Sequence, residues 1–357
     1  MLSKYRLDYK RNRYATAIID ISGATLLHYK KNELLKNIKK ILVIRLDHIG
    51  DVIVSVPALR ALRKSYPNAS ITIMVRSLTK ELLENCPYVD EVLVYDPLWY
   101  RGKKTFSLSK HIKFFKNIRK RNFDLAIDLR GELRNIVVAY LCNSRYRLAY
   151  DVKGGDFLLT HVGRYDDKLH IIDRNLNLLK TIGINSKDRK LELFTTNKEK
   201  KFIDNLLKKN KIKNFVILHP GSGGLLKLYD NKKFAKIGDY LSKKYNVILT
   251  GSNNESWMTE EIKNNMNSNV LDLTGELDLL QLTELIKRAK LFVSTDSGPM
   301  HIAKAVNTKL ISLFGTSLSN VWGYKDKNSI LIENKGNVKL ININQVIVAI
   351  KKHGLFR

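Results

Sequence analysis

Short apolar runs rich in β-branched residues, each followed by a polar or glycine-containing turn, constrain the fold of this chain more than any other feature. In the first half the runs are "ILVIRL" (41–46), "SITIMVR" (70–76), "EVLVYD" (91–96) and "DLAIDLR" (124–130). Such runs are typical of buried strands in a parallel sheet. Helical segments separate them, among them "VSVPALRALRKSYP" and a basic stretch around "HIKFFKNIRKR". This alternation predicts βαβ units and an α/β domain.

The same pattern starts again after a polar, lysine-rich interval near residues 185–212. Five strand-then-turn units follow, at 214–222, 246–252, 269–275, 290–298 and 309–317. We therefore predict a second α/β domain, with this division of the chain: a basic arm over 1–39, domains over 40–190 and 191–340, and a C-terminal helix over 341–357. Ligands of open parallel sheets bind beyond the carboxyl ends of the strands. Two Rossmann-like domains are thus expected to face each other across a cleft.

The formal net charge of +29 is the strongest compositional signal. Such a charge attracts nucleic acid, an acidic membrane surface or phosphorylated substrates, although a lysine-rich bias that only solvates the surface is the alternative. No RNP-like strand, zinc-finger spacing or recognition helix is present in the sequence, so nucleic acid is not the expected partner. The apolar patch "ATAIIDISGATLLHY" in the basic arm is either an amphipathic helix on a membrane surface or a packed N-terminal segment.

Two cysteines, Cys86 and Cys142, make neither a disulfide framework nor a CxxC motif. Both are expected to be buried thiols in a reducing compartment. The N-terminus has no secretory signal pattern, and no stretch approaches the roughly 18 consecutive apolar residues of a spanning helix. A cytoplasmic location is therefore expected.

The first motif, "RLDHIGDVIVSVPALRAL", places Asp47, Gly50 and Asp51 in a turn between a strand and a helix. A carboxylate at a helix start commonly caps the helix. The helix N-terminus also holds a carboxylate in its ionised form, and an ionised Asp51 in a cleft can act as a general base. The motif lacks the GxGxxG spacing of dinucleotide-binding folds.

The second motif, "LHPGSGGLLK", runs from a strand into a glycine-rich loop. Backbone amides at Gly221 and Gly223, with Ser222 and Lys227, predict a phosphate cradle, although a flexible loop is the alternative. The spacing of a Walker A loop is absent. The turn "TGSNNES" places Glu255 where it can accept a hydrogen bond from a ribose hydroxyl.

The third motif, "STDSGPMHIAKAV", ends a strand at Asp296, Ser297 and Gly298, and Pro299 suits the first turn of the following helix. Free amides and the helix dipole favour an anion at this point. His301, in the first turn, can donate to a phosphate oxygen or can be a packed residue.

Taken together, these segments resemble the glycosyltransferase family 9 heptosyltransferases, which have the GT-B fold and use ADP-heptose to extend lipopolysaccharide. The resemblance covers roughly residues 40–325 and is carried by "IRLDHIGDVIVSVPALRALRKSYP", "HPGS" with the following lysine, "LDLTGELDLLQLTELIKRAKLFVSTDSGPMHIAKAV" and "LFGTS". "FDLAIDLRGELRN" is similar to an internal segment of that family. The sequence departs from the family at "KLYD" (227–230), where members commonly have an Arg-Trp-Pro-like run, and this departure bears on the identity of the donor.

The resemblance implies an inverting transfer of a sugar from a nucleotide-sugar donor to a lipopolysaccharide core or related anionic glycan, at the inner face of the cytoplasmic membrane. It assigns Asp51 as the catalytic base and these residues to the donor: Ser222, Lys227, Glu255, Asp296, Ser297, Gly298 and His301. Acceptor carboxylates or phosphates can be met by arginines that are otherwise solvated: Arg60, Arg63, Arg130 and Arg134. No metal cofactor is expected, because no DxD motif occurs in a suitable loop. The alternatives are a transferase or epimerase that uses another nucleotide sugar and, on charge alone, a nucleic-acid-binding protein.

Overall fold

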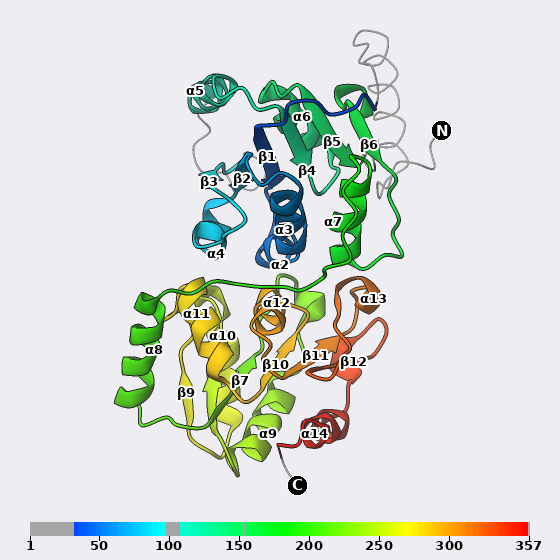
Figure 1. The fold of residues 1–357 in the computed structure, drawn as a ribbon. Helices are drawn as coiled ribbons and strands as arrows, with labels where there is room; N and C mark the ends of the chain where they lie inside the picture. The colour runs from blue at the N-terminus through cyan, green and yellow to red at the C-terminus, as the bar shows by residue number, and fades with distance from the viewer. Residues whose placement is uncertain (1–31, 98–107, 151, 153, 356–357) are drawn as a thin grey trace. The chain divides into compact units, whose positions relative to one another are not determined.

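The computed structural model describes residues 32–97, 108–150, 152 and 154–355 (Figure 1). The chain divides into two compact units, Met1–Arg189 and Lys190–Arg357, and each contains its own parallel sheet. Residues 1–31 of the basic arm, including the apolar patch, lie outside the described residues. None of the helices in the described part of the chain is long and apolar enough to cross a membrane.

The first unit is built on a six-stranded parallel sheet with the strand order β3-β2-β1-β4-β5-β6. The strands are β1 (Lys40–Arg45), β2 (Ser70–Val75), β3 (Glu91–Val94), β4 (Leu125–Asp128), β5 (Tyr146–Tyr150) and β6 (His161–Gly163). Ile41 of β1 pairs with Ile71 on one side and Leu125 on the other, so β1 lies inside the sheet. The four predicted strands are confirmed, with bounds that differ from the prediction by one or two residues, whereas β5 and β6 were not predicted.

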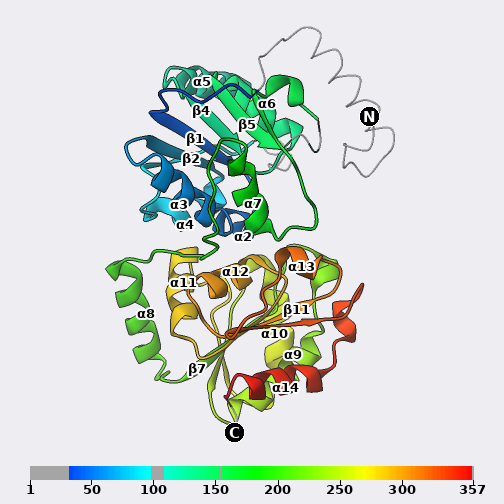
Figure 2. The same cartoon turned by 45° about the vertical axis from the view of Figure 1, so that its right-hand side comes forward.

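Helices cover both faces of this sheet (Figure 2). They are α2 (Ile49–Ile53), α3 (Val56–Ser65), α4 (Glu81–Glu84), α5 (Leu108–Arg119), α6 (Leu133–Leu141) and α7 (Ile171–Lys180), with short 3₁₀ turns at Ser77–Thr79 and Asp156–Leu158. Ala149 of β5 packs with Ile136 of α6. The hydroxyl of the next residue, Tyr150, donates to the Arg174 carbonyl of α7 at 2.7 Å. Since successive strand residues point to opposite faces, α6 and α7 lie on opposite sides of β5.

The second unit repeats the arrangement with the strand order β12-β11-β10-β7-β8-β9, again all parallel. Its strands are β7 (Phe215–His219), β8 (Asn246–Leu249), β9 (Val270–Asp272), β10 (Phe292–Thr295), β11 (Leu310–Phe314) and β12 (Ser329–Glu333). The five predicted strands are present, and β12 is an additional edge strand.

The helices of the second unit are α8 (Asn197–Lys209), α9 (Asn231–Ser242), α10 (Ser256–Asn265), α11 (Leu279–Arg288), α12 (Gly298–Ala305), α13 (Ser319–Trp322) and α14 (Ile343–Lys352), with 3₁₀ turns at Leu225–Lys227, Asn253–Glu255 and Val338–Leu340. The lysine-rich interval thus contains a helix, α8, which the sequence interpretation treated as a polar spacer. The C-terminal helix α14 is part of the core of the second unit, because Val346 and Ile350 pack in one cluster with Val293 and Ile311.

The same topological feature occurs in both sheets. In the first sheet, β2 and β3 are added in turn on one side of β1. The chain then returns to the other side of β1, where β4, β5 and β6 follow one another. The second unit does the same with β7 and β10. The strand order therefore reverses between β1 and β4 and between β7 and β10, and the carboxyl ends of such adjacent strands are where open α/β sheets bind ligands.

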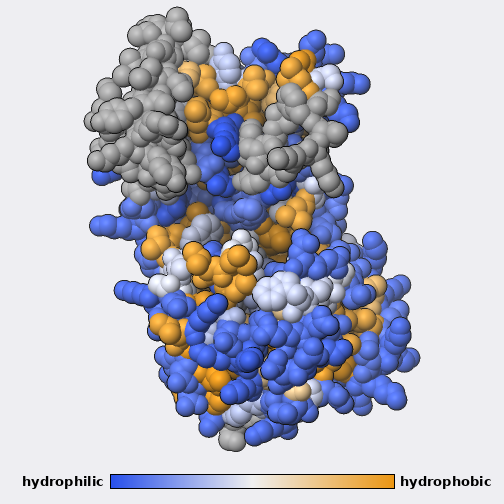
Figure 3. Space-filling model, turned by 180° about the vertical axis from the view of Figure 1, so that it is seen from behind, coloured by the Kyte–Doolittle hydropathy of each residue, from blue (hydrophilic) through white to orange (hydrophobic). Residues whose placement is uncertain are grey.

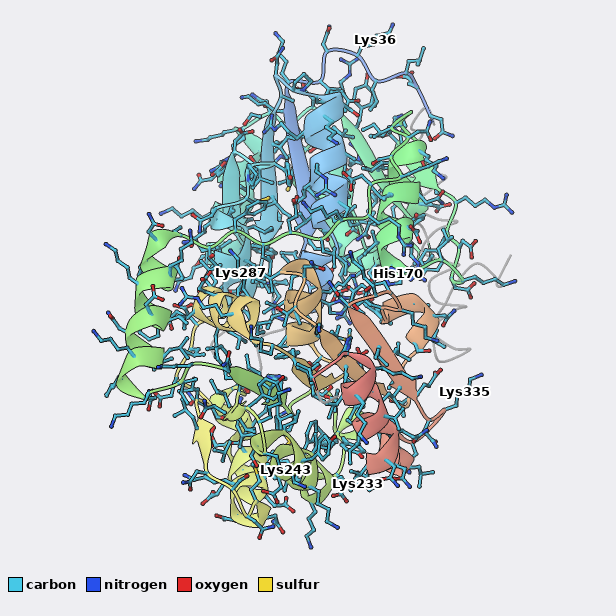
Figure 4. The ribbon with its side chains drawn as sticks, turned by 60° about the horizontal axis from the view of Figure 1, so that its bottom comes forward. Lys36, His170, Lys233, Lys243, Lys287 and Lys335 are labelled. Carbon is cyan, nitrogen blue, oxygen red and sulfur yellow. The ribbon has the colours of Figure 1, made fainter. Side chains whose placement is uncertain are left out.

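Within the residues that the structure describes, lysines are spread over many elements and do not form one stripe. Figure 4 labels examples from separate segments, including Lys36, Lys233, Lys287 and Lys335. On the face shown in Figure 3 the second unit is mostly hydrophilic. This distribution suits a solvated surface better than a dedicated nucleic-acid groove.

Candidate active site

At the carboxyl edge of the second sheet, hydrogen bonds connect the loop after β7 with the loop after β10. The Ser222 hydroxyl donates to the Asp296 carbonyl at 2.8 Å, and the Thr295 hydroxyl donates to the Gly221 carbonyl at 2.9 Å. The Lys227 ammonium donates to the Asp296 carboxylate at 2.6 Å. The glycine-rich loop and the Asp296 motif, some 70 residues apart in the sequence, therefore form one structure at the switch point.

The start of α12 has the features of an anion site. Ser297 is the N-cap residue, but its side chain makes no capping hydrogen bond. Its hydroxyl is buried and has no hydrogen-bond partner among the described residues. Gly298, the first helical residue, is partly exposed. The free amides of a first helical turn, the helix dipole and an uncommitted hydroxyl all favour a negatively charged group here.

Glu255 joins the same edge from the loop after β8. Its carboxylate accepts from the Ser252 amide at 2.6 Å and the Ser252 hydroxyl at 2.8 Å. It also lies against Gly221: a Cβ added at Gly221 would come within 2.0 Å of the Glu255 Oε1. Only glycine allows this close approach of backbone to carboxylate.

His219, at the end of β7, is a neighbour of this group that the sequence interpretation missed. Its Nδ1 shares a hydrogen bond of 3.1 Å with the Thr250 hydroxyl. Burial lowers the pKa of His219, and the Glu255 carboxylate acts in the opposite direction. The His219 imidazole is therefore neutral and held in place beside Glu255 at the carboxyl edge.

His301 is buried in the first turn of α12. Its Nδ1 lies 2.5 Å from the Tyr324 hydroxyl, and its ring contacts Trp322 and Tyr324 edge to face. This is the packed arrangement that the sequence interpretation held as the alternative. A direct hydrogen bond from His301 to a phosphate stays a prediction.

Tyr229 and Asp230, the last two residues of the "KLYD" run, anchor this loop to the rest of the second unit. The buried Tyr229 hydroxyl donates to the Ile341 carbonyl at 2.9 Å. Asp230 caps α9 by accepting from the Lys233 amide at 2.9 Å. The loop that carries Lys227 is therefore held firmly at its far end.

In the first unit, Asp51 lies at the carboxyl edge, in the first turn of α2. It accepts from the Arg45 guanidinium at 3.1 Å and from the His48 amide at 3.3 Å. Its side chain is 19% exposed. Asp51 therefore takes part in capping its helix and still presents its carboxylate to solvent, while its role as a general base stays a prediction.

Arg45 and Asp47 form the support behind Asp51, and neither was among the predicted site residues. The buried Arg45 guanidinium also donates to the Asp51 carbonyl at 3.1 Å and lies 3.5 Å from the fully buried Asp47 carboxylate. Arg130, from the loop after β4, pairs with Asp47 and with Glu132. A charged network thus joins the ends of β1 and β4.

Asp128, the last residue of β4, is the second carboxylate that the sequence interpretation missed. It accepts from the Gly131 amide at 2.9 Å and from the Asn135 amide at 3.2 Å. Burial raises the pKa of Asp128 to about 6, and the negative charge of Asp47 adds to the effect. The signal available in the sequence was the position of Asp47 and Asp128 at the ends of two strands, which meet because the strands are parallel neighbours.

The four predicted acceptor arginines separate into two pairs. Arg130 and the exposed Arg134 lie at the carboxyl edge, where an acceptor is expected. Arg60 is buried and forms a two-pronged ion pair with Asp188 at 2.9 and 2.7 Å. Arg63 donates to the Ala69 carbonyl at 2.7 Å and pairs with Asp90, at the amino edge of β2. Arg60 and Arg63 thus brace α3 through these contacts, and a role for them toward the acceptor stays a prediction.

The sequence profile of glycosyltransferase family 9 (heptosyltransferase) matches residues 111–346, well over half of the chain. This chain belongs to glycosyltransferase family 9. The matched segment contains the donor motifs of the second unit, whereas Asp51 precedes it. The resemblance stated from the motifs is confirmed.

Two relatives are similar to this chain over most of their length. Lipopolysaccharide heptosyltransferase 3 of Escherichia coli is 27% identical over 286 residues, covering 76% of this chain and 82% of that protein. Lipopolysaccharide core heptosyltransferase OpsX of Haemophilus influenzae is 24% identical over 350 residues, covering 89% and 98%.

Two solved structures share the fold. A family 9 glycosyltransferase from Veillonella parvula superposes with a TM-score of 0.80 at 21% identity, covering 90% of this chain and 99% of that one. E. coli ADP-heptose LPS heptosyltransferase II gives 0.76 at 23% identity, covering 88% and 98%. With two six-stranded parallel sheets, the predicted GT-B architecture is confirmed.

Proposed function

We propose that this family 9 glycosyltransferase moves a heptose from ADP-heptose to a lipopolysaccharide core or related anionic glycan, with inversion at the anomeric carbon. The observation that carries the proposal is the meeting of Lys227, Ser222 and the uncapped start of α12 at the switch point of the second sheet. The names of the relatives, which are lipopolysaccharide heptosyltransferases, support the choice of sugar and acceptor.

The donor diphosphate fits between Lys227 and the first amides of α12. Without a donor, the Lys227 ammonium is neutralised by Asp296, whose side chain is nearly buried. A bound diphosphate would attract Lys227 and leave Asp296 to accept hydrogen bonds from sugar hydroxyls. The uncommitted Ser297 hydroxyl would gain a phosphate oxygen as its acceptor. Preorganised donors of this kind contribute roughly 3–4 kcal/mol each where charge develops in the transition state.

Asp51 supplies the base in this proposal. Its carboxylate takes the proton of an acceptor hydroxyl, whose oxygen attacks the anomeric carbon from the face opposite the diphosphate. The bond from that carbon to the diphosphate oxygen breaks, and ADP leaves with the electron pair. A positioned base typically contributes about 10²- to 10⁴-fold in rate. Arg45 positions Asp51 by holding both its carboxylate and its carbonyl.

The leaving diphosphate is met by Lys227 and by helix amides, so we propose that transfer needs no metal ion and continues in the presence of EDTA. The acceptor is placed at the carboxyl edge of the first sheet, near Arg130 and Arg134. The strong positive charge suits a lipid-linked acceptor at the anionic inner face of the cytoplasmic membrane. Peripheral contact with that surface is part of the proposal.

The test is a product assay with purified ADP-heptose and a core acceptor that lacks the terminal heptose. Mass spectrometry is expected to show the acceptor heavier by one heptose, and NMR of the new linkage is expected to show the inverted anomer. Lys227→Gln is expected to weaken donor binding by about tenfold or more, because one charge-assisted hydrogen bond to the diphosphate is lost. Consumption of donor without any acceptor would indicate an epimerase or hydrolase and would refute the proposal.

The "KLYD" run gives a second candidate, a GT-B transferase that uses another nucleotide sugar. Thermal unfolding with a panel of nucleotide sugars separates the two candidates, since a ligand that binds only the folded state raises the melting temperature. A larger shift with a uridine or guanosine sugar than with ADP-heptose would favour the second.

A further inference from the structure

A cavity of about 510 Å³ lies at the amino edge of the first sheet. Its walls come from the turn between α5 and β4, which contains Asn122 and Asp124, and from the turn between α6 and β5, which contains Asn143 and Arg145. Because the strands are parallel, this edge is opposite to the carboxyl edge that carries Asp51. The cavity is therefore separate from the proposed catalytic machinery.

The side chains that line the cavity include three arginines and one carboxylate. Arg119, Arg145 and Arg147 supply the positive charge. The carboxylate is Asp124, which already accepts from the backbone amides of Lys39 and Lys40 at 2.8 Å each. The lining thus has a net positive charge, and its one negative group is held by hydrogen bonds to the chain.

Arg147 forms a rigid wall of the cavity. It is buried, and its guanidinium donates to the Leu158 and Ser144 carbonyls at 2.6 Å each. It also lies over the Tyr140 ring, 5.7 Å from the centroid. A cation fixed in this way adds a permanent positive field to the pocket.

The other two arginines are exposed and available. The Arg145 guanidinium stacks over Tyr146 at 4.9 Å. Within the part of the chain that the structure describes, neither Arg119 nor Arg145 has a side-chain hydrogen bond or ion pair. Two planar guanidinium groups at the mouth of one cavity suit an oxyanion that can accept several hydrogen bonds.

Ser144 provides an independent indication of a ligand. Its side chain is 2% exposed and lines the cavity, yet its hydroxyl has no hydrogen-bond partner among the described residues. Buried hydroxyl groups are nearly always paired, because leaving one unpaired destabilises the fold. A bound anion at Arg119 and Arg145 would supply the missing acceptor.

We propose that this amino-edge pocket is a second binding site, for a phosphate group carried by a phosphomonoester or phosphodiester. Arg119 and Arg145 bind the phosphate oxygens and the Ser144 hydroxyl donates to one of them. The source is either a soluble phosphorylated compound or a lipid headgroup. The exposed face of α5, which leads into Arg119 and carries Leu108, Ile112 and Lys113, is compatible with a bilayer.

Calorimetric titration of the full chain with inorganic phosphate tests the site. The double variant Arg119→Gln/Arg145→Gln is expected to bind phosphate at least about tenfold more weakly, because charge-assisted hydrogen bonds are lost while side-chain length is kept. The control Lys201→Gln/Lys208→Gln removes the same formal charge from exposed positions of α8 and is expected to change little. Phosphate that binds at the donor edge is unaffected by either change. Equal affinity in the wild type and the arginine variant would overturn the proposal.

Ser144→Ala distinguishes a ligand site from a structural hydroxyl. Without ligand the variant should be as stable as the wild type or slightly more so, since it removes an unpaired buried group, while phosphate affinity falls several-fold. Loss of stability with unchanged phosphate affinity would contradict the proposal.

Co-sedimentation with phosphatidylglycerol–phosphatidylcholine vesicles identifies the source of the phosphate. Weaker vesicle binding by the arginine variant, but not by the lysine control, would support a lipid headgroup. Weaker binding of inorganic phosphate with unchanged vesicle binding would support a soluble compound.

Discussion

Replacement of the buried Asp128 by asparagine should make the protein less sensitive to pH. The pKa of Asp128 is raised from 3.8 to about 6 in the folded state. Between these values the folded chain binds more protons than the unfolded chain, so the free energy of unfolding falls as the pH rises through this window. Two pKa units correspond to about 3 kcal/mol, present below about pH 4 and lost above about pH 6. Asparagine does not titrate, so Asp128→Asn lacks this loss.

Scanning calorimetry between pH 4 and pH 7.5 measures the effect for the transition of the first unit. For a unit of this size about 3 kcal/mol corresponds to roughly 6–12 °C in melting temperature. The wild type should lose that much relative to Asp128→Asn as the pH rises. Glu260→Gln, at an exposed carboxylate of α10, is the control and should follow the wild type. A constant difference between wild type and Asp128→Asn at every pH would refute the assignment of a raised pKa to this carboxyl.

Three further changes test the roles assigned to the site residues. Gly221→Ala must displace the Glu255 carboxylate, because the new Cβ would approach its Oε1 to 2.0 Å. A donor titration should then show binding that is weaker by about tenfold. Unaltered donor affinity would exclude Glu255 from the donor site. Arg60→Ala should lower the free energy of unfolding by about 1–3 kcal/mol, because the ion pair with Asp188 is lost, and should leave the acceptor KM unchanged. A raised acceptor KM without loss of stability would assign Arg60 to acceptor binding instead. Lys227→Gln should be rescued neither by added metal nor by excess acceptor, as donor saturation curves will show.

Continuous apolar runs made nine of the strands predictable. The strands β1 and β7 are buried along almost their whole length. Nearly every position in them is therefore apolar, and the run is easy to recognise in the sequence. The strands that were missed give weaker signals: "YRLAY" mixes polar with apolar residues, and "HVG" is three residues long. The helix α8 was missed because few of its side chains are buried, with Ile203 its one fully buried apolar residue.

The grouping of the proposed donor residues could be predicted, because the end of a strand fixes the position of the loop that follows it. Ser222, Lys227 and Asp296 all follow strands whose carboxyl ends share one edge. The distance of a helical residue from the carboxyl edge was harder to predict from the sequence. Arg63 lies seven residues into α3, which at 1.5 Å per residue carries it about 10 Å away from that edge. Arg45 and Asp128 are the last residues of β1 and β4. They were missed because each stands in an apolar run, and only the pairing of β1 with β4 brings them to one edge.

The most direct measurement compares two properties of Asp51→Asn: its affinity for ADP-heptose and its rate of single-turnover transfer to the core acceptor. If the second unit binds the donor and Asp51 supplies the base, the dissociation constant should stay at the wild-type value while the rate falls by about 10²- to 10⁴-fold. A rate that falls less than about threefold with donor binding intact would contradict that assignment of the base.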